Sequence, residues 1–426
     1  MNRTAIYLLY YFTFSLLTFA YATFVTPVFS YEGNDWIPNQ MKLWESFIML
    51  TIILVFIPKR FNKPSDILLH IQLLLPILPM LVLYGASDKP REYIYYTIVS
   101  FFILMLIVRY LDFKLLAMPK ISSKIIGRIL LVMGGLYILS IITFGGLKYL
   151  NFDLKKVYEF RSISASNLPT IFGYFSPIVS KVFLPFLLII SIVNKSKTFI
   201  CISIAFSILA FGMTHHKGTL FYPFLAMGLY YIFTMKNVIP MMIIAYLSII
   251  VISLLIYMIN ESNIFFGSLL LRRVYFVPAQ INYFYYDYFS LNSFILWAES
   301  KLTLGLIDYQ YPLSMPRMIG LEYFGNEITN ANTGWIGSGY AQAGLIGMII
   351  YSVIIGIIFN TLNIFSKRVN KNIILPITIV PVFSVMTSSD LPTAFLTHGL
   401  ILVLILVSIL AVKPQYFYKT IPRYKN

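Results

Sequence analysis

The sequence predicts an all-helical, polytopic membrane protein with about twelve transmembrane helices, organised as a single domain over residues 1–426. Hydrophobic residues make up 59% of the chain and charged residues only 11%. The mean hydropathy is +0.80, which excludes a soluble globular protein. Apolar stretches of about twenty residues, the length that crosses a bilayer core, recur along the chain, and Lys and Arg are distributed unequally between the segments that join them.

Twelve apolar stretches are predicted to span the membrane. They cover residues 4–26, 41–58, 67–86, 93–112, 125–147, 177–194, 198–213, 220–235, 239–260, 340–365, 373–388 and 396–412. The first is too long for the apolar core of a signal peptide, and no small-residue cleavage site follows it. It is therefore predicted to be the first span.

The charge distribution orients these spans. With the N-terminus inside, the inner segments contain nineteen of the 32 Lys and Arg residues but only two of the 16 acids. Because cytoplasmic loops carry the excess of Lys and Arg, both termini are predicted to be cytoplasmic. The net charge of +16 is then a topology signal, and nucleic acid is not an expected partner. The lone cysteine, Cys201, excludes an intramolecular disulfide.

Two outer segments are long, 148–177 and 261–339, and both are predicted to be periplasmic loops. Charged and aromatic side chains are concentrated in the second loop, where water and lipid headgroups reach them. Chemistry on a polar substrate is therefore expected at this face, which favours a membrane enzyme over a plain channel or anchor.

Cations on the outer side contradict the positive-inside rule and are candidates for binding an anion. They are Arg161, Lys217, Arg272, Arg273 and Arg317. Guanidinium groups bind phosphate through paired, charge-assisted hydrogen bonds, and at the headgroup level they would stabilise a departing diphosphate without metal. For each cation the alternative is a surface ion pair or snorkelling. His216, beside Lys217 in a polar turn, is a further candidate for contacting the anion.

Glycosyl transfer to a sugar hydroxyl needs a group that accepts its proton, usually a carboxylate or a histidine. The outer carboxylates are Glu159, Asp287, Asp308, Glu322, Glu327 and Asp390. The sequence does not choose among them; Glu159 and Asp287 are kept as catalytic candidates. The chain has no Asp-x-Asp motif, so a cation-dependent mechanism with a nucleotide sugar is not predicted. Neither a metal nor a cofactor is expected.

Aromatic and amide side chains complete the set of candidates. Tyr275 and the rings that follow it suit sugar faces, but they suit the bilayer interface equally. Asn330 and Asn332 are candidates for binding sugar hydroxyls. The Gly and Asn density around them permits a tight turn and close approach of the backbone to a bound group. Three ionisable residues in or near spans are given no role: His70, Lys181 and His398.

Together these features resemble the O-antigen polymerase family, the Wzy-type polymerases of oligosaccharide repeat units. The resemblance is carried by the twelve-span plan and by four segments: 157–161, 214–218, 272–279 and 330–347. The last segment is the most specific. The loop arginines of the family would correspond to Arg161, to Arg272 or Arg273, and to Arg317, whereas Lys217 stands where relatives often have Arg. Gly173 lies twelve residues past Arg161, close to a spaced Arg–Gly pattern of some members.

The resemblance implies transfer of a growing glycan from undecaprenyl diphosphate to a new lipid-linked repeat unit. The reaction would take place on the periplasmic side of the bacterial inner membrane, without metal. The implied partners are undecaprenyl-diphosphate-linked oligosaccharides, the lipid bilayer and a chain-length regulator protein. Two alternatives stay open: a flippase or exporter of lipid-linked oligosaccharide, and an O-antigen ligase, which differs mainly in its acceptor.

Overall fold

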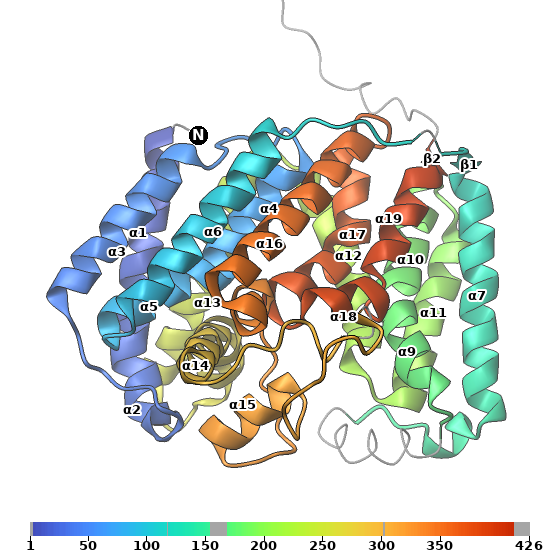
Figure 1. The fold of residues 1–426 in the computed structure, drawn as a ribbon. Coiled ribbons are helices and arrows are strands. Elements are labelled where there is room, and N and C mark those ends of the chain that lie inside the picture. The colour runs from blue at the N-terminus through green and yellow to red at the C-terminus, as the bar shows by residue number, and fades with distance from the viewer. Residues whose placement is uncertain (1–2, 117, 154–167, 301–302, 413–426) are drawn as a thin grey trace, which may run out of the picture.

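The computed structural model describes residues 3–116, 118–153, 168–300 and 303–412. Within these residues the chain is almost entirely helical (Figure 1). The only named strands there are β1 (Ile121–Ser122) and β2 (Leu410–Ala411), which pair in parallel.

The helices follow one another along the chain, mostly with short connections, and the connection between α14 and α15 is long. They are α1 (Arg3–Ala20), η1 (Tyr21–Val25), α2 (Thr26–Phe29), η2 (Ser30–Glu32), α3 (Gln40–Phe56), α4 (Pro64–Gln72), η3 (Leu73–Ile77), α5 (Leu78–Ala86), α6 (Arg91–Tyr110), α7 (Ser123–Thr143), η4 (Gly146–Tyr149), α9 (Ile171–Ile178), η5 (Val179–Phe183), α10 (Leu184–Val193), α11 (Lys197–Thr214), α12 (Lys217–Phe233), α13 (Val238–Ile259), η6 (Gly267–Phe276), α14 (Val277–Leu291), α15 (Met315–Phe324), α16 (Trp335–Ser366), α17 (Lys371–Thr387), α18 (Leu391–Leu396) and α19 (Leu400–Ile409).

Several of these helices are long and apolar enough to cross a membrane, so the chain is a multi-pass membrane protein. Among the described residues eight continuous helical runs meet both conditions: Arg3–Glu32, Pro64–Ala86, Arg91–Tyr110, Ser123–Thr143, Ile171–Val193, Lys197–Thr214, Val238–Ile259 and Trp335–Ser366. The other four predicted spans also fall on helices, namely α3, α12, α17 and α19. The helical class is thus confirmed, and the count of twelve stays a prediction.

Within the part of the chain that the structure describes, several basic residues predicted for the inner side lie close together at one end of the bundle. Arg3, the segment 59–63 and Arg109 line a common cavity, although they are distant in sequence. Lys371 lines a second cavity that shares Lys59 and Arg60 with the first. Figure 1 shows the start of α1 and the end of α19 at this same end, with α15 and α18 at the opposite one.

Residues 261–339, expected to form a loop, contain a buried helix. Helix α14 packs against α16 and α5, and Figure 1 looks along its axis while its neighbours are seen from the side. Its tyrosines lie in the core, not in the belt expected for the bilayer interface: Tyr283 and Tyr285 are 1% and 0% exposed. Their hydroxyls donate to the carbonyls of Met80 and Ala331, at 3.0 and 3.1 Å. Tyrosine can be buried here because its polar tip has a partner.

Wide π-helical turns interrupt four of the helical runs, at η1, η3, η5 and η6. In η3 the carbonyl of Leu74 would pair with the amide of residue 79, which is a proline and has no N–H. The hydroxyl of Tyr246 donates to this carbonyl instead, at 2.8 Å. The turn is therefore tied to α13, and no backbone acceptor is left without a donor at this point.

The glycines of the segment 330–347 allow close packing of backbone on backbone. A Cβ at Gly334 would lie 2.2 Å from the Met386 carbonyl oxygen of α17, and one at Gly347 would lie 2.1 Å from the Gly339 carbonyl oxygen. Real Cβ contacts are never this short, so only glycine fits at these positions. The close approach expected toward a bound group is made to neighbouring backbone instead.

Candidate functional site

A cavity of about 340 Å³ lies beside the first half of α16, at the end of the bundle opposite the basic segments. Its walls come from the connection between α14 and α15, from α16, and from the residues on both sides of α18. The polar side chains used below are Glu299, Asn332, Thr333, Gln342, Asp390 and His398. A volume of this size suits a small polar ligand or one sugar ring with part of its neighbour.

Asp390 is fixed in this cavity by two donors from α16. The Tyr351 hydroxyl donates to Asp390 Oδ1 at 2.7 Å, and Gln342 Nε2 donates to Oδ2 at 3.2 Å. Trp297 Nε1 in turn donates to the Tyr351 hydroxyl at 3.0 Å. Burial raises the pKa of Asp390 although these hydrogen bonds lower it. The carboxylate is thus held in one orientation and is more basic than an ordinary aspartate.

A break in α16 makes this arrangement possible. Gly344 has φ 57° and ψ −140°, and Ala343 before it is also non-helical. The carbonyls of Ala341 and Gln342 therefore leave the helical ladder and accept from the amides of Ile295 and Leu296, at 3.0 and 2.9 Å. Irregular backbone inside a membrane bundle is tolerated where it is paired or lines a cavity. Here the backbone at the break is paired, and it also lines the cavity.

A second carboxylate, Glu299, lines the same cavity. Its Oε2 accepts from the backbone amide of Met315 at 3.0 Å, at the start of α15. Burial raises the pKa of Glu299, and the negative charge of Asp390 raises it further, although the Met315 amide lowers it. The charge of one cavity carboxylate thus perturbs the other, and interacting acids with shifted pKa values are typical of sites for proton transfer.

His398 lines the cavity from the turn between α18 and α19. Its Nδ1 is 2.8 Å from the Ser389 hydroxyl. Burial, followed by the charge on Lys181, lowers the pKa of His398 to about 3. The ring is therefore neutral near pH 7 and can donate or accept a hydrogen bond without adding charge. Lys181, on η5 nearby, donates to the Ser384 hydroxyl at 3.1 Å.

Two residues with polar side chains line this part of the cavity wall. Asn332 is exposed, with its backbone amide bonded to the Asn330 carbonyl. Thr333 is buried, and its hydroxyl makes no hydrogen bond to any residue that the structure describes. This hydroxyl lies against Gly337 of α16, where an added Cβ would come within 2.9 Å of it. Asn332 is therefore the one of the two that a ligand can reach.

The structure brings some of the predicted site residues to this cavity. Asn332 lines it, and the exposed Arg317 directly follows two lining residues, Met315 and Pro316. Asn330 is exposed next to the cavity, and its side chain donates to the Ile328 carbonyl at 3.4 Å. Among the predicted anion-binding cations that the structure describes, Arg317 is the one that directly follows lining residues in sequence.

The paired arginines of η6 lie in different environments. Arg272 donates to both carboxylate oxygens of Glu32, at 2.6 and 3.0 Å, and its guanidinium group lies 4.5 Å from the Phe29 ring centroid. The side chains of Arg272 and Glu32 are both largely buried. Arg273 is exposed and forms no ion pair with a described residue. The anion bound by Arg272 is therefore the Glu32 carboxylate of the protein itself.

The remaining candidates lie elsewhere. Tyr275 is buried with its ring 4.3 Å from the Tyr246 ring. Asp287 is exposed on α14, and His216 and Lys217 begin α12, where Lys217 is exposed. Two predicted catalytic residues lie outside the described residues: Glu159 and Arg161.

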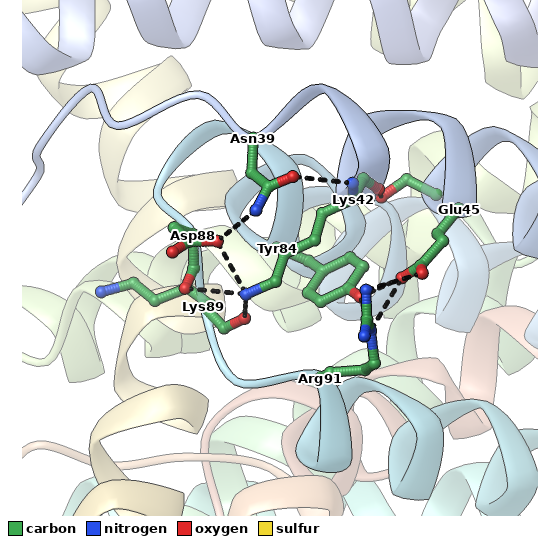
Figure 2. A network of polar contacts seen from close by, with 8 residues as sticks. Asn39, Lys42, Glu45, Tyr84, Asp88, Lys89 and Arg91 are labelled. Atoms are coloured by element: carbon green, nitrogen blue, oxygen red, sulfur yellow. Dashed lines mark hydrogen bonds and ion pairs between the residues drawn. The ribbon is translucent and has the colours of Figure 1, made fainter.

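A second polar network joins the ends of α3, α5 and α6 (Figure 2). Lys42 pairs with Asp88 at 2.8 Å, and Arg91 pairs with Glu45 at 2.8 Å while Nε of the same arginine donates to the Tyr84 hydroxyl at 3.1 Å. Lys42 and Arg91 each have their own carboxylate, while Lys89 takes part through its backbone carbonyl. The network therefore holds the connection 87–90 in place and leaves little charge for a ligand.

The sequence assigned no role to three residues that line the cavity, Glu299, Gln342 and His398, or to Tyr351, which donates to Asp390. Gln342 and Tyr351 stand in an apolar span, where a polar side chain is a signal of internal contacts. Asp390 was one of six outer carboxylates that sequence could not rank. Comparison of the chain with protein-family models, with curated proteins and with solved structures finds no match. The function has therefore to be argued from the contacts of the cavity itself.

Proposed function

We propose that this protein is a membrane glycosyltransferase that extends an oligosaccharide carried on undecaprenyl diphosphate, in the manner of O-antigen polymerases. The reaction takes place at the outer face of the bacterial inner membrane. The observation that supports it best is Asp390, a carboxylate with raised pKa that Tyr351 and Gln342 orient into a cavity. A membrane enzyme that deprotonates a sugar hydroxyl needs such a group within reach of its substrate.

In this proposal Asp390 accepts the proton of the acceptor hydroxyl. The acceptor oxygen then forms a bond to the anomeric carbon of the growing glycan, and the bond from that carbon to the diphosphate oxygen breaks. Undecaprenyl diphosphate leaves with the electron pair, and no other reactant is consumed. The raised pKa makes Asp390 a better proton acceptor than an exposed carboxylate. Asn332, exposed in the cavity wall, would hydrogen-bond a sugar hydroxyl.

The departing diphosphate needs cations near its oxygens. Arg317 adjoins the cavity and has no ion pair with a described residue, so it is the first candidate. Lys181 lies close enough to His398 to lower the pKa of that ring, which makes it the second candidate. Arg161 stays a candidate from sequence. Arg272 is given a structural role, because Glu32 already occupies its guanidinium group.

We further propose twelve spans with both termini in the cytoplasm. The gathering of basic segments at one end of the bundle supports this orientation, because cytoplasmic loops carry the positive charge. Asp308, exposed in the connection before α15, would then face the periplasm. In a Cys201→Ser background, Asp308→Cys is expected to react with a membrane-impermeant maleimide in intact spheroplasts. Reaction only after lysis of the spheroplasts would reverse the orientation.

The proposed reaction is tested with purified protein in proteoliposomes. A defined undecaprenyl-diphosphate oligosaccharide is supplied as both donor and acceptor, with EDTA present, and the products are resolved by gel electrophoresis. A ladder of products that differ by one repeat unit is expected, together with release of undecaprenyl diphosphate. Transfer to a lipid A core acceptor but not to the repeat unit would identify a ligase. Absence of both products from protein that is folded and supplied with native glycolipid would exclude the proposal.

A flippase is the second candidate, and one observation favours it. The basic cavity at the inner end of the bundle is a place where a lipid-linked anion could enter. However, this cavity is lined from α1, α3, α4 and α6 and shares no lining residue with the Asp390 cavity. The two cavities therefore do not form one path. Movement of labelled lipid-linked oligosaccharide across liposomes without elongation would favour the flippase.

A further inference from the structure

A cavity of about 860 Å³ lies at the opposite end of the bundle. Five cations line it: Arg3, Lys59, Arg60, Lys63 and Arg109. They come from the start of α1, from the connection between α3 and α4, and from the end of α6. Three segments that are distant in sequence thus direct positive charge into one space.

The connection between α3 and α4 is held rigidly. His70 Nε2 is 2.7 Å from the Pro58 carbonyl oxygen, which can only accept, so Nε2 carries the proton. His70 Nδ1 then accepts from the Tyr10 hydroxyl at 2.6 Å. Asp66 Oδ2 accepts from the amides of Asn62 and Lys63, at 2.7 and 2.8 Å. The basic segment is therefore preorganised and does not have to order itself around a ligand.

The charge of this cavity is not neutralised within the described residues. Asp66 is the single acid among the lining residues, and it is occupied by backbone amides. The three ion pairs of the described residues all involve other residues. Burial, followed by the charge on Arg3, lowers the pKa of Lys59 to about 8. Anionic partners would relieve this repulsion.

One side of the cavity is apolar and open. Val55 and Phe56 at the end of α3 and Leu106 on α6 line it, with 60%, 54% and 51% of their surfaces exposed. These side chains belong to the outer surface of the bundle, where a bilayer would contact them. A soluble anion would gain nothing from such a wall, whereas acyl chains would.

We infer that this cavity binds the phosphate headgroup of an anionic membrane lipid, whose acyl chains lie along Val55, Phe56 and Leu106. Arg60 and Arg109, both exposed at the mouth of the cavity, contact the phosphate oxygens. Arg3 and Lys63 add to the local potential, and Lys59 is fixed by its bond to the Ile57 carbonyl at 2.8 Å. The site is independent of the glycosyl transfer proposed at the other face.

The test measures lipid binding by the full-length protein. Wild-type protein in phosphatidylcholine nanodiscs is titrated with phosphatidylglycerol, and bound lipid is counted by native mass spectrometry. Arg60→Gln/Arg109→Gln is compared with Lys124→Gln/Arg128→Gln. The control removes the same charge from the same end of the bundle, at two exposed positions on α7 outside the cavity. Size-exclusion profiles and thermal melts establish that both variants fold. If the double cavity variant does not fold, Arg60→Gln and Arg109→Gln are measured singly.

We expect the cavity variant to bind phosphatidylglycerol at least about tenfold more weakly, since each of the two cations near an anionic headgroup contributes roughly fivefold to the affinity. The control should change the dissociation constant less than about twofold. Inorganic pyrophosphate, used as a soluble competitor, should not displace the lipid. Equal losses of affinity in both variants would show that the lipid responds only to the diffuse surface potential, and the proposed site would be overturned. Displacement by pyrophosphate, or no retained lipid in wild type, would overturn the lipid assignment.

Discussion

Asp390→Asn is expected to reduce glycan elongation by about 10²–10⁴-fold, the contribution typical of a general base. Asparagine keeps the size of the side chain and can still accept from the Tyr351 hydroxyl, but it cannot take up the proton of the acceptor. The measurement is the rate of ladder formation by the purified variant in proteoliposomes. Tyr351→Phe removes one of the two donors to Asp390, so a smaller loss is expected from it.

The matched control for Asp390 is Asp308→Asn, the same chemical change at an exposed position of the outer segment. It should leave elongation within about twofold of wild type, as is usual for a surface side chain away from the reacting groups. If both variants elongate at the wild-type rate, Asp390 is not the base.

The same residue is expected to determine the acid side of the pH profile of elongation. Burial raises the pKa of Asp390, and only the deprotonated form can accept a proton. As pH falls through this raised pKa, elongation should therefore be lost at a higher pH than with an ordinary aspartate. Asp390→Glu should retain activity and shift the acid limb of the pH profile.

Arg272→Ala is expected to destabilise the protein by about 2–4 kcal/mol, because it leaves the largely buried Glu32 carboxylate without its partner. Glu32→Gln should destabilise it for the complementary reason. Both effects should appear as lower midpoints of thermal unfolding in detergent. The double variant Arg272→Ala/Glu32→Gln should recover part of the loss, since no uncompensated charge remains.

Arg273→Ala is the control, because Arg273 is the exposed neighbour in the same turn. It should change the free energy of unfolding by less than about 1 kcal/mol relative to wild type. If Arg272→Ala instead keeps wild-type stability and loses only elongation, Arg272 acts on the substrate, as the sequence suggested. The two roles are thus separated by comparing stability with rate.

The sequence was sufficient for the parts of the fold that depend on local apolarity. Each predicted span falls on a helix, because a bilayer-length apolar run has few other solutions. Helix α14 was missed because its tyrosines look polar in isolation. Their burial depends on carbonyls such as those of Met80 and Ala331, which come from other parts of the chain. Local composition does not contain that pairing.

The candidate site was harder to predict from the sequence for the same reason. Asp390 meets Tyr351 and Gln342 only because α16 breaks at Gly344 and residues 295–296 dock on the break. A glycine in a span suggests a possible break, but not its direction. The partner of Arg272 lies far away in sequence at Glu32. Sequence could therefore name acids and cations as candidates, while their pairing came from tertiary contacts.

The π turns have a consequence for how the chain can vary in length. A π turn holds one residue more than the α-helical turn it replaces, so removing one residue there restores an ordinary helix. Because a full turn is replaced by a full turn, the residues beyond the deletion would keep the faces they present to their neighbours. The same deletion in a regular part of the helix would instead rotate everything beyond it by roughly 100°, the angle between successive residues of an α-helix. At η5 the loss of one residue would therefore leave the packing face of α10 in place.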